Sequence, residues 1–337
     1  MQIVSKLQKL FLRFGFYSHV YSRCKAYLAP GVYRINRTNN IIYNYSSKGK
    51  AHTECGYMVK SIGHKVRFHE FFISLLFTRI KVCKSKFNAT LLMMTSSGEE
   101  SKLFDYSTNT LITVYDDFEK AERIFKNRQQ WSKFFLTNSL NIERIEGSAC
   151  IIEPLLNKVP FHTYEYFDLL VDQYIPNAPK LFSSDVGYEI GFVASFCRYI
   201  GCEISEDSIL QYLKVAPKAL THGDMWPSNV LYDGTCYYHL DFEYVGNRIF
   251  FYDLYYYMFN DMFVLKNTFL FRNYLDGDYD EKLVAFFNSY GMSYFDYPRE
   301  FYLLVTMYFI FLERWNKAGC ENFMQIIRQF LIDNKML

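Results

Sequence analysis

Residues 222–243 constrain the fold of this chain more tightly than any other stretch. They read His-Gly-Asp-Met-Trp-Pro-Ser-Asn, then eleven residues, then Asp-Phe-Glu. Between Asn229 and Asp241 lie two short apolar or aromatic runs, separated by Asp233 and Gly234. An Asp-Gly pair between two such runs is a strong signal for a β-hairpin. Because a hairpin brings its two ends together, we expect Asn229 and Asp241 to lie side by side.

The carboxylates and the amide of this stretch suit phosphoryl transfer from a nucleotide. That reaction needs one carboxylate at the acceptor hydroxyl, and a second carboxylate with an amide oxygen to hold Mg²⁺ against the phosphates. Asp224 is the candidate for the first role and would take the hydroxyl proton late in the reaction. Asn229 and Asp241 are the candidates for the metal, since a hard ion prefers oxygen ligands. Glu243 is a weaker candidate for a second ion or its water shell.

The order His-Gly-Asp, four residues, Asn and then Asp-x-Glu resembles the catalytic core of the aminoglycoside phosphotransferase / choline kinase family. Gly246 and Asp253 occupy the places of that family's segment after the metal aspartate, so the close match covers about 33 residues, 221–253. The resemblance implies ATP and Mg²⁺ as cofactors. It also implies that Asp253 braces the catalytic loop from below. For His222, bracing through hydrogen bonds is favoured over proton transfer.

That family is the small-molecule branch of the protein-kinase-like fold, and a chain of 337 residues suits two packed lobes. We therefore expect an α+β, two-lobed protein-kinase-like fold, with a small, mostly antiparallel sheet in the N-lobe and a larger helical C-lobe. The expected parts are a basic N-terminal extension, the N-lobe, and the C-lobe with catalytic loop 221–243; they span residues 1–60, 61–154 and 155–337. Apolar residues recur at helical spacing in four C-lobe segments, 252–264, 280–290, 299–317 and 322–334. The aromatic tract 250–257 is expected to be core rather than a base-stacking surface.

The order of elements from 85 to 160 suits a kinase N-lobe. A strand is expected at 87–94, a hairpin of strands 102–106 and 110–115, and a helix at 118–135 that Asp116 or Asp117 can cap. A further strand, 149–153, leads to Pro154. By the resemblance it runs into the hinge that contacts adenine, with residues 153–156 as the hinge candidate.

This region departs from the family in two ways. A glycine-rich phosphate loop is not evident, because Ser96-Ser97-Gly98 is the only small-residue turn in the right place. The strand that should carry the phosphate-binding lysine has Thr113 instead, and a hydroxyl cannot replace an ammonium. The nucleotide-binding candidates are Ser97, Gly98, Lys102, Thr113, Glu122, Glu153 and Leu155. For the charged residues Lys102 and Glu122, a solvated surface charge is favoured over a role in binding. On the helix, Lys120 and Arg123 are further candidates for the missing cation and Glu119 for its acidic partner, and for each of them a solvated surface charge is again favoured.

Charge is unevenly distributed along the chain. Through residue 98 there are 16 basic residues against Glu54 and Glu70, whereas 21 basic residues face 33 acidic ones from 99 onward. The basic front, 1–98, indicates an anionic partner such as a membrane surface or a glycan; no specific nucleic acid is expected. The alternative is a basic face that balances the acidic lobe. Residues 3–14 show a short basic amphipathic pattern, which can lie on a membrane or pack on the protein itself.

The eight cysteines are scattered and form no CxxC pair, so we expect reduced thiols in a cytosolic protein. No apolar run reaches 18 residues, the length that a membrane span requires. A cytoplasmic location is expected, with peripheral binding at the inner face of the membrane as an alternative.

Three functions stay open at this point. The leading one is an ATP- and Mg²⁺-dependent phosphotransferase whose acceptor is a hydroxyl of a small molecule, of the sugar, aminoglycoside or amino-alcohol type. The second is a kinase of a membrane-surface glycan or lipid. The third is a pseudokinase or nucleotide-binding scaffold, which Thr113 and the missing glycine loop favour.

Overall fold

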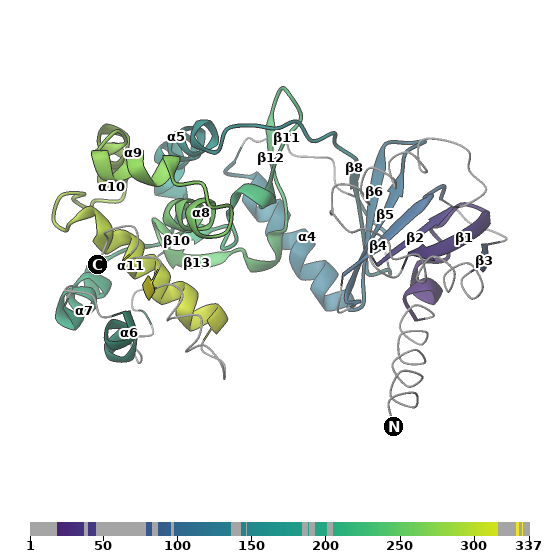
Figure 1. Cartoon of the computed structure of the whole chain (residues 1–337), viewed down its shortest axis with the longest axis horizontal. Coiled ribbons are helices and arrows are strands. Elements are labelled where there is room, and N and C mark those ends of the chain that lie inside the picture. Colours follow the sequence, from purple (N-terminus) through teal and green to yellow (C-terminus); the bar gives the residue numbers. More distant parts are fainter. Residues whose placement is uncertain are drawn as a thin grey trace. The chain divides into compact units, whose positions relative to one another are not determined.

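The computed structural model of the chain describes most of its length outside the N-terminal region. The described residues are 19–36, 40–44, 79–82, 87–95, 98–135, 143–145, 147–183, 188, 193–200, 205–315, 328–329 and 332. The chain divides into two compact units, of which unit 1 comprises Met1–Lys126 and Ser139–Asn157, and unit 2 comprises Asn127–Asn138 and Lys158–Leu337 (Figure 1). The amphipathic segment 3–14 lies outside the described residues, and so does most of the expected helix 322–334.

Unit 1 is built on an antiparallel sheet. Its described strands follow the order β3-β1-β2-β4-β5-β6-β8-β7, and each neighbouring pair is antiparallel. The bounds are β1 Gly31–Asn36, β2 Ile41–Asn44, β3 Arg79–Val82, β4 Leu91–Met94, β5 Glu100–Asp105, β6 Thr110–Tyr115, β7 Glu143–Arg144 and β8 Cys150–Pro154.

Local side-chain chemistry explains the two best-predicted elements of this unit. The β5–β6 hairpin is confirmed, and its turn is closed by Asp105, whose Oδ1 accepts the backbone N–H groups of Ser107 (2.9 Å) and Thr108 (3.3 Å). The predicted helix is also confirmed as α4, Phe118–Ser132. Its cap is Asp117, whose Oδ1 accepts the N–H of Glu119 at 2.9 Å.

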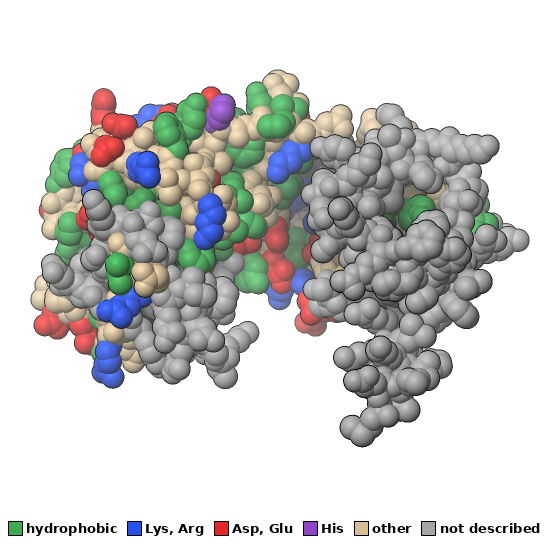
Figure 2. Space-filling view, in the orientation of Figure 1, with side chains coloured by type: hydrophobic (Ala, Val, Ile, Leu, Met, Phe, Trp, Pro, Cys, Tyr) green, Lys and Arg blue, Asp and Glu red, His purple; other side chains and the backbone are tan. Residues whose placement is uncertain are grey.

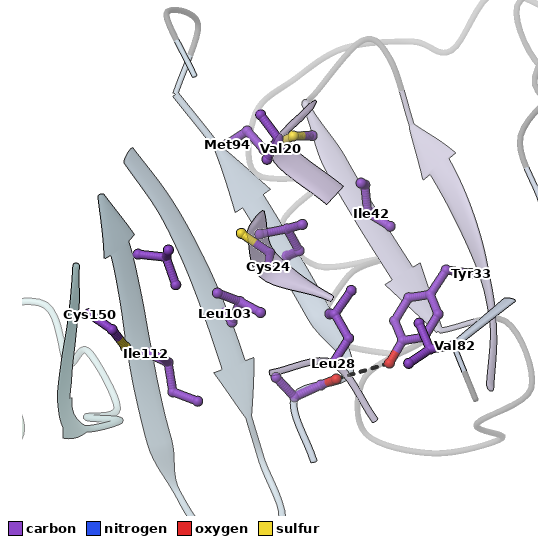
Figure 3. Packing of buried hydrophobic residues seen from close by; sticks show 13 residues of the cluster. Val20, Cys24, Leu28, Tyr33, Ile42, Val82, Met94, Leu103, Ile112 and Cys150 are labelled. Atoms are coloured by element: carbon purple, nitrogen blue, oxygen red, sulfur yellow. Dashed lines mark hydrogen bonds between the residues drawn. The ribbon is translucent and has the colours of Figure 1, made fainter. Parts of the chain in front are cut away.

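The sheet of unit 1 has apolar residues on both faces. One face carries a cluster, called here the sheet core, to which the segment 19–28 contributes Val20, Cys24 and Leu28 (Figure 3). The Tyr33 hydroxyl, at the edge of the sheet core, donates to the carbonyl oxygen of Ala89 at 3.0 Å. The other face carries a smaller, partly exposed cluster whose members are Ile41, Tyr43, Leu91, Met93, Phe104, Tyr106, Leu111 and Leu155.

Unit 2 is mainly helical. Its helices are α5 Thr163–Leu181, α6 Val193–Ile200, α7 Glu206–Val215, α8 Tyr252–Phe263, α9 Phe269–Asp276, α10 Asp280–Ser289 and α11 Arg299–Ile310, which continues as a π-helical turn, Phe311–Trp315. A small sheet has the order β13-β10-β9, with bounds β9 Phe182–Ser183, β10 Lys218–Thr221 and β13 Gly246–Ile249. A separate hairpin joins β11 Val230–Tyr232 to β12 Tyr237–His239.

Helix α8 lies amid the other elements of unit 2 (Figure 1), and α11 packs against it. All residues of α8 from Tyr252 to Met262 are buried, and all residues of α11 from Phe301 to Ile310 are buried. A helix that is apolar on most sides belongs in a core. The prediction that the aromatic tract 250–257 is core is therefore confirmed. On the face drawn in Figure 2, acidic, basic and apolar side chains of unit 2 are interspersed.

The two units confirm the expected α+β class, since one is an antiparallel sheet and the other is mainly helical. Within the part of the chain that the structure describes, we find no helix with the length and apolar character that crossing a membrane requires.

Candidate active site

The loop that carries Asp224 leaves β10 through a turn that requires glycine. Gly223 has a φ of 78°, in the left-handed region that side chains disfavour. A Cβ atom at this position would also clash with the carbonyl oxygen of Tyr244 and with the guanidinium of Arg248. Glycine is thus needed at this position for its backbone angle and for the close approach of two neighbours.

Asp253, at the start of α8, holds the backbone of this loop from a buried position. Its carboxylate accepts the N–H of His222 at 2.6 Å and the N–H of Gly223 at 2.9 Å, and the hydroxyl of Tyr174 donates to it as well. Burial raises the pKa of Asp253 above its ordinary value, although these three hydrogen bonds oppose the shift by favouring the charged form. The bracing role expected for Asp253 thus has a direct geometric counterpart in two hydrogen bonds to loop amides.

Asp224 itself is nearly buried, with 8% of its surface exposed. The hydroxyl of Tyr256 donates to its Oδ1 at 2.8 Å, and Nδ2 of Asn229 donates to its Oδ2 at 2.8 Å. The same Nδ2 also donates to the backbone oxygen of Asp224 at 2.9 Å. Asn229 and Tyr256 thus each donate a hydrogen bond to a different oxygen of the Asp224 carboxylate.

The predicted hairpin is present and brings Asn229 close to the end of β12. Val230 pairs with His239, and the N–H of Leu240 donates to the backbone oxygen of Asn229 at 2.9 Å. Asp241 follows directly and adopts the left-handed conformation, with φ 61° and ψ 73°. Left-handed backbone in a non-glycine residue is uncommon and gathers at functional sites. The two ends of the hairpin thus meet, as the Asp-Gly turn predicts.

The donor groups at these two ends fit a hard cation. Both hydrogen bonds of the Asn229 side chain use Nδ2, so its Oδ1 is turned away from Asp224. Asp241 supplies a carboxylate in an exposed position, and Glu243 lies in the 3₁₀ turn Phe242–Tyr244 that follows it. Among the residues that the structure describes, no group of three or more His, Cys, Asp or Glu forms a metal cage. Mg²⁺ typically uses one or two carboxylates plus substrate phosphates and water, so such a cage is not required.

A buried layer of rings supports the loop and the hairpin. The indole N–H of Trp131 donates to Nδ1 of His239 at 2.8 Å, and the other ring nitrogen of His239 meets the Tyr166 hydroxyl. Because an indole nitrogen can only donate, the neutral His239 ring carries its proton on Nε2. Burial, and then the neighbouring His222, lower the pKa of His239 well below its ordinary value. The Tyr166 hydroxyl in turn donates to the sulfur of Met225 at 3.6 Å, which links this layer to the residue after Asp224.

His222 belongs to the same layer. Its ring is completely buried and contacts the rings of Trp131 (5.4 Å between centroids) and Phe242 (5.0 Å). Its backbone N–H donates a hydrogen bond to the Asp253 carboxylate, as the N–H of Gly223 also does. The ring contacts of His222 suit a supporting role, whereas its backbone rather than its ring makes the hydrogen bond to Asp253.

Arg248, on β13, is committed to contacts within unit 2. Its Nε donates to both carboxylate oxygens of Glu313, at 2.8 and 3.0 Å, and its Nη1 donates to the carbonyl oxygen of Tyr244 at 2.8 Å and to Thr221 Oγ1 at 3.2 Å. Burial opposes its charge, but the ion pair with Glu313 raises the pKa of Arg248 above its ordinary value. Because Nη1 is also the atom that crowds Gly223, Arg248 fixes the entry to the loop.

In unit 1, Thr113 lies in the middle of the sheet. It pairs with Lys102 on β5 and with Ile151 on β8, and only 4% of its surface is exposed. The Lys102 ammonium extends toward solvent, where it pairs with Glu100 at 3.2 Å. The structure thus places the two predicted residues side by side across strands, with the cation engaged by an acidic neighbour.

Two basic side chains, Arg23 and Lys120, contact the β4–β5 turn of unit 1. Gly98 has a φ of 78°, and its carbonyl oxygen accepts a hydrogen bond from Nη2 of Arg23 at 2.7 Å. The next residue, Glu99, meets the ammonium of Lys120 at 3.5 Å; 14% of the Lys120 side chain is exposed. The other predicted residue of the turn, Ser97, lies outside the described residues.

The remaining nucleotide candidates lie on α4 and β8. Glu122 pairs with Arg144 on β7 and with Lys126 one helical turn away, the latter at 3.1 Å. Glu153 lies on β8, opposite Leu111 of β6. Leu155 donates its N–H to the β5–β6 loop at 2.7 Å and packs on the smaller apolar cluster.

Two residues of the site in unit 2 escape the sequence reasoning, namely Tyr256 and Tyr174. A signal for Tyr256 exists, because residues three apart in a helix share a face, and Asp253 and Tyr256 are three apart on α8. Tyr174 carries no such signal, since its helix α5 is distant in sequence from Asp253.

Comparison with known proteins finds similarity only among solved structures. No protein-family model matches this sequence, and no curated protein matches it either. A putative aminoglycoside phosphotransferase from Ralstonia eutropha aligns with 12% identity over 71% of this chain and 89% of its own, with a TM-score of 0.44. A choline/ethanolamine kinase family protein from Mesorhizobium loti aligns with 9% identity over 70% of this chain and 85% of its own, with a TM-score of 0.36.

A third similar structure is an amicoumacin kinase in complex with AMP-PNP, Ca²⁺ and its ligand. It aligns with 13% identity over 72% of this chain and 88% of its own, with a TM-score of 0.38. The chain thus resembles solved aminoglycoside phosphotransferases and choline/ethanolamine kinases, at low identity. At this level the similarity says nothing of the acceptor.

Proposed function

We propose that this protein is an ATP- and Mg²⁺-dependent phosphotransferase that acts on a hydroxyl group of a small molecule. The observation that carries the proposal is the setting of Asp224. Its loop is held by two backbone hydrogen bonds to Asp253, and its two carboxylate oxygens are held by Asn229 and Tyr256. A carboxylate fixed in this way suits a reaction that depends mainly on positioning and on the neutralisation of charge.

In the proposed reaction, Asp224 meets the acceptor. The acceptor hydroxyl donates a hydrogen bond to the Asp224 carboxylate, which orients the hydroxyl oxygen toward the γ-phosphorus of ATP. As the new P–O bond forms, the bond from the γ-phosphorus to the β–γ bridging oxygen breaks and ADP leaves with that electron pair. The hydroxyl proton passes to Asp224 late in this step.

The metal proposed for this site would be held by Asn229 and Asp241. Bound Mg²⁺ supplies positive charge that neutralises the nucleotide phosphates. The chain's own contribution is to orient the donors. The bonds from Nδ2 to Asp224 fix which side of the Asn229 amide presents its oxygen, and the β11–β12 hairpin brings residue 241 to the same end of the hairpin as Asn229. Glu243 is the further candidate for a second ion.

The nucleotide is proposed to bind through unit 1. Its β4–β5 turn contains Gly98, and the smaller apolar cluster beside Leu155 offers an apolar surface for a base. Thr113 cannot supply charge to the phosphates. Lys120 is the proposed substitute, because its ammonium already lies beside Glu99 at that turn and little of its side chain is exposed. Lys102 is the weaker candidate, since it extends to solvent.

A screen for ATP consumption tests the proposal. The protein is incubated with Mg-ATP and with aminoglycosides, choline, ethanolamine, sugars and cell-envelope glycans, and Asp224→Asn is the matched control. We expect ADP formation that depends on one acceptor class, and a loss of at least about 1,000-fold in Asp224→Asn, with ATP still bound. Unchanged turnover in Asp224→Asn would remove Asp224 from the proposed role.

The same screen distinguishes a second candidate, a pseudokinase or nucleotide-binding scaffold. The observation that favours it is the buried Thr113 at the position where a cation is expected. A scaffold of this kind would consume no ATP with any acceptor. The arrangement of Asp224, Asn229 and Asp241 favours the enzyme, since a scaffold has no need of an oriented carboxylate beside two proposed metal ligands.

A further inference from the structure

Two residues on one face of helix α8, Asp253 and Tyr256, form hydrogen bonds with the candidate catalytic loop. Asp253 accepts the N–H groups of His222 and Gly223 (2.6 and 2.9 Å), and Tyr256 donates its hydroxyl to Oδ1 of Asp224 at 2.8 Å. Residues three apart in a helix are surface neighbours, so both contacts come from one side of α8. One rigid element therefore sets the backbone of the loop and also the side chain of Asp224.

The two hydrogen bonds to the Asp224 carboxylate fix its plane. Rotation about the last side-chain bond of an aspartate is soft, so the backbone alone does not determine where the two oxygens point. Tyr256 holds Oδ1 and Asn229 holds Oδ2, each at 2.8 Å. Asn229 is also a proposed metal ligand, and its amide must serve both partners. Of the two donors to the Asp224 carboxylate, Tyr256 is therefore the one that is not also a proposed metal ligand.

Tyr256 is itself held in place. Its ring stacks on that of Tyr252, with 5.4 Å between centroids and 15° between planes, and the guanidinium of Arg248 lies over the Tyr252 ring at 5.2 Å. Nδ2 of Asn260 donates to the backbone oxygen of Tyr256 at 2.8 Å. The residue is 5% exposed. A hydrogen bond between such buried groups is stronger than one in water, and the fixed ring makes it directional.

We propose that Tyr256 is a positioning residue, which orients the Asp224 carboxylate for the acceptor hydroxyl. This inference rests on the proposed function. The phenol contacts Asp224 rather than the reacting phosphorus, so its effect reaches the reaction only through the direction of the carboxylate. Loss of its hydroxyl leaves the proposed ATP-binding residues of unit 1 untouched. The effect therefore falls on kcat and spares the KM for ATP.

The experiment uses the full chain with Mg-ATP, and water as the phosphoryl acceptor, together with any acceptor that the screen identifies. The variants are Tyr256→Phe, Asp224→Asn and the double substitution. Tyr257→Phe is the matched control, since it removes a hydroxyl from the next residue of α8, where the partner is the carbonyl oxygen of Thr163 at 3.2 Å. A hydrogen bond to a charged group is worth about 1.5–3 kcal/mol, so we expect kcat to fall roughly 10- to 100-fold in Tyr256→Phe.

Three further readouts complete the test. The KM for ATP stays within about twofold in Tyr256→Phe, and Tyr257→Phe keeps the wild-type kcat within about threefold. In the Asp224→Asn background, Tyr256→Phe lowers the residual rate by less than about twofold, because the group through which it acts is gone. The positioning role is overturned if Tyr256→Phe lowers kcat by the same factor in the wild-type and in the Asp224→Asn protein. It is also overturned if Tyr256→Phe keeps the kcat of an active wild type. Neither outcome affects the proposed function. A wild type that consumes no ATP with water or any acceptor overturns the proposed function and this role with it.

Discussion

At the scale of single residues, the conformation of loop 222–229 depends on steric crowding at Gly223 and on the protonation state of His239, as well as on hydrogen bonds. A Cβ at Gly223 would clash with neighbouring atoms, and the buried His239 ring accepts a hydrogen bond from Trp131 and packs among other aromatic rings. These constraints act on stability whether or not the protein turns over a substrate. Each can therefore be measured without knowledge of the acceptor.

Gly223→Ala is expected to destabilise the protein more than the same change at Gly291. Both glycines have left-handed backbone, with φ of 78° and 72°, but a Cβ at Gly291 meets no atom within 4 Å. Gly291→Ala thus reports the backbone penalty alone, about 1–2 kcal/mol. Gly223→Ala adds a clash with the carbonyl of Tyr244, which raises the loss by a further ~1–3 kcal/mol. Urea unfolding of both variants measures the difference, and equal losses would show that the crowding at Gly223 is relieved without cost.

His239 is expected to make stability depend on pH below about 6.5, the ordinary pKa of a histidine. Its pKa in the folded protein is lowered by burial and then by His222, so the unfolded state binds the proton first as the pH falls. Where the unfolded state binds more protons, the free energy of unfolding decreases with falling pH, here by up to about 1.4 kcal/mol per pH unit. The stability is fully present above pH 6.5 and is lost on acidification.

The measurement is urea unfolding between pH 7.5 and pH 5.5 for the wild type and for His239→Gln, in a range chosen from the ordinary histidine pKa. The variant has no titrating ring, so its free energy of unfolding is expected to be lower throughout and to change less over this range. A pH dependence as steep in His239→Gln as in the wild type would assign it to other groups.

At the scale of elements, local chemistry explains which predictions succeed. The β11–β12 and β5–β6 hairpins carry their turn signals in Asp233-Gly234 and Asp105, and α4 carries its cap in Asp117. Helix α5 has no comparable signal, and it contains Pro176 and Pro179, residues that normally argue against a helix. Its position follows from tertiary packing, which periodicity cannot reveal.

The candidate site follows the same division. The order of Asp224, Asn229 and Asp241 along the chain, with a hairpin between the last two, is readable because it is local. The hydrogen bond from Tyr174 to Asp253 joins α5 to α8 and depends on how the two helices pack. The strand expected at 87–94 is shorter in the structure, where β4 begins at Leu91. Ala89 instead forms an isolated β-bridge with Leu28, in the segment that covers the sheet core.

The α4 element carries a prediction about the nucleotide. Lys120→Met is expected to raise the KM for ATP roughly tenfold or more, because a contact between an ammonium and a phosphate is worth about 1.5–3 kcal/mol. Lys102→Met is the matched control and is expected to change the KM by less than about twofold, since its side chain is 41% exposed and pairs with Glu100. Isothermal titration with a non-hydrolysable ATP analogue gives the same comparison without turnover. A larger loss of affinity in Lys102→Met than in Lys120→Met would reverse the assignment.

At the scale of the whole molecule, charge is separated along the chain. The first 98 residues hold 16 basic and two acidic residues, and the remainder holds 21 basic and 33 acidic ones. The described part of unit 2 mixes both signs over the face seen in Figure 2. The excess of basic residues is therefore concentrated in the first 98 residues of the chain.

The alternative of a membrane-surface acceptor predicts salt-sensitive binding to phosphatidylserine vesicles. Each basic residue near an anionic surface contributes about 1 kcal/mol, so Lys6→Gln, Lys9→Gln and Arg13→Gln together should weaken binding by roughly 100-fold. Substitution is preferable to removal of residues 1–25, because Val20 and Cys24 belong to the sheet core and their loss would unfold unit 1. Vesicles of phosphatidylcholine alone are the control for charge, and co-sedimentation at low and high salt is the measurement. Equal binding by the wild type and the triple variant would contradict a role in membrane binding. It would favour the alternative that the basic residues balance the acidic remainder of the same molecule.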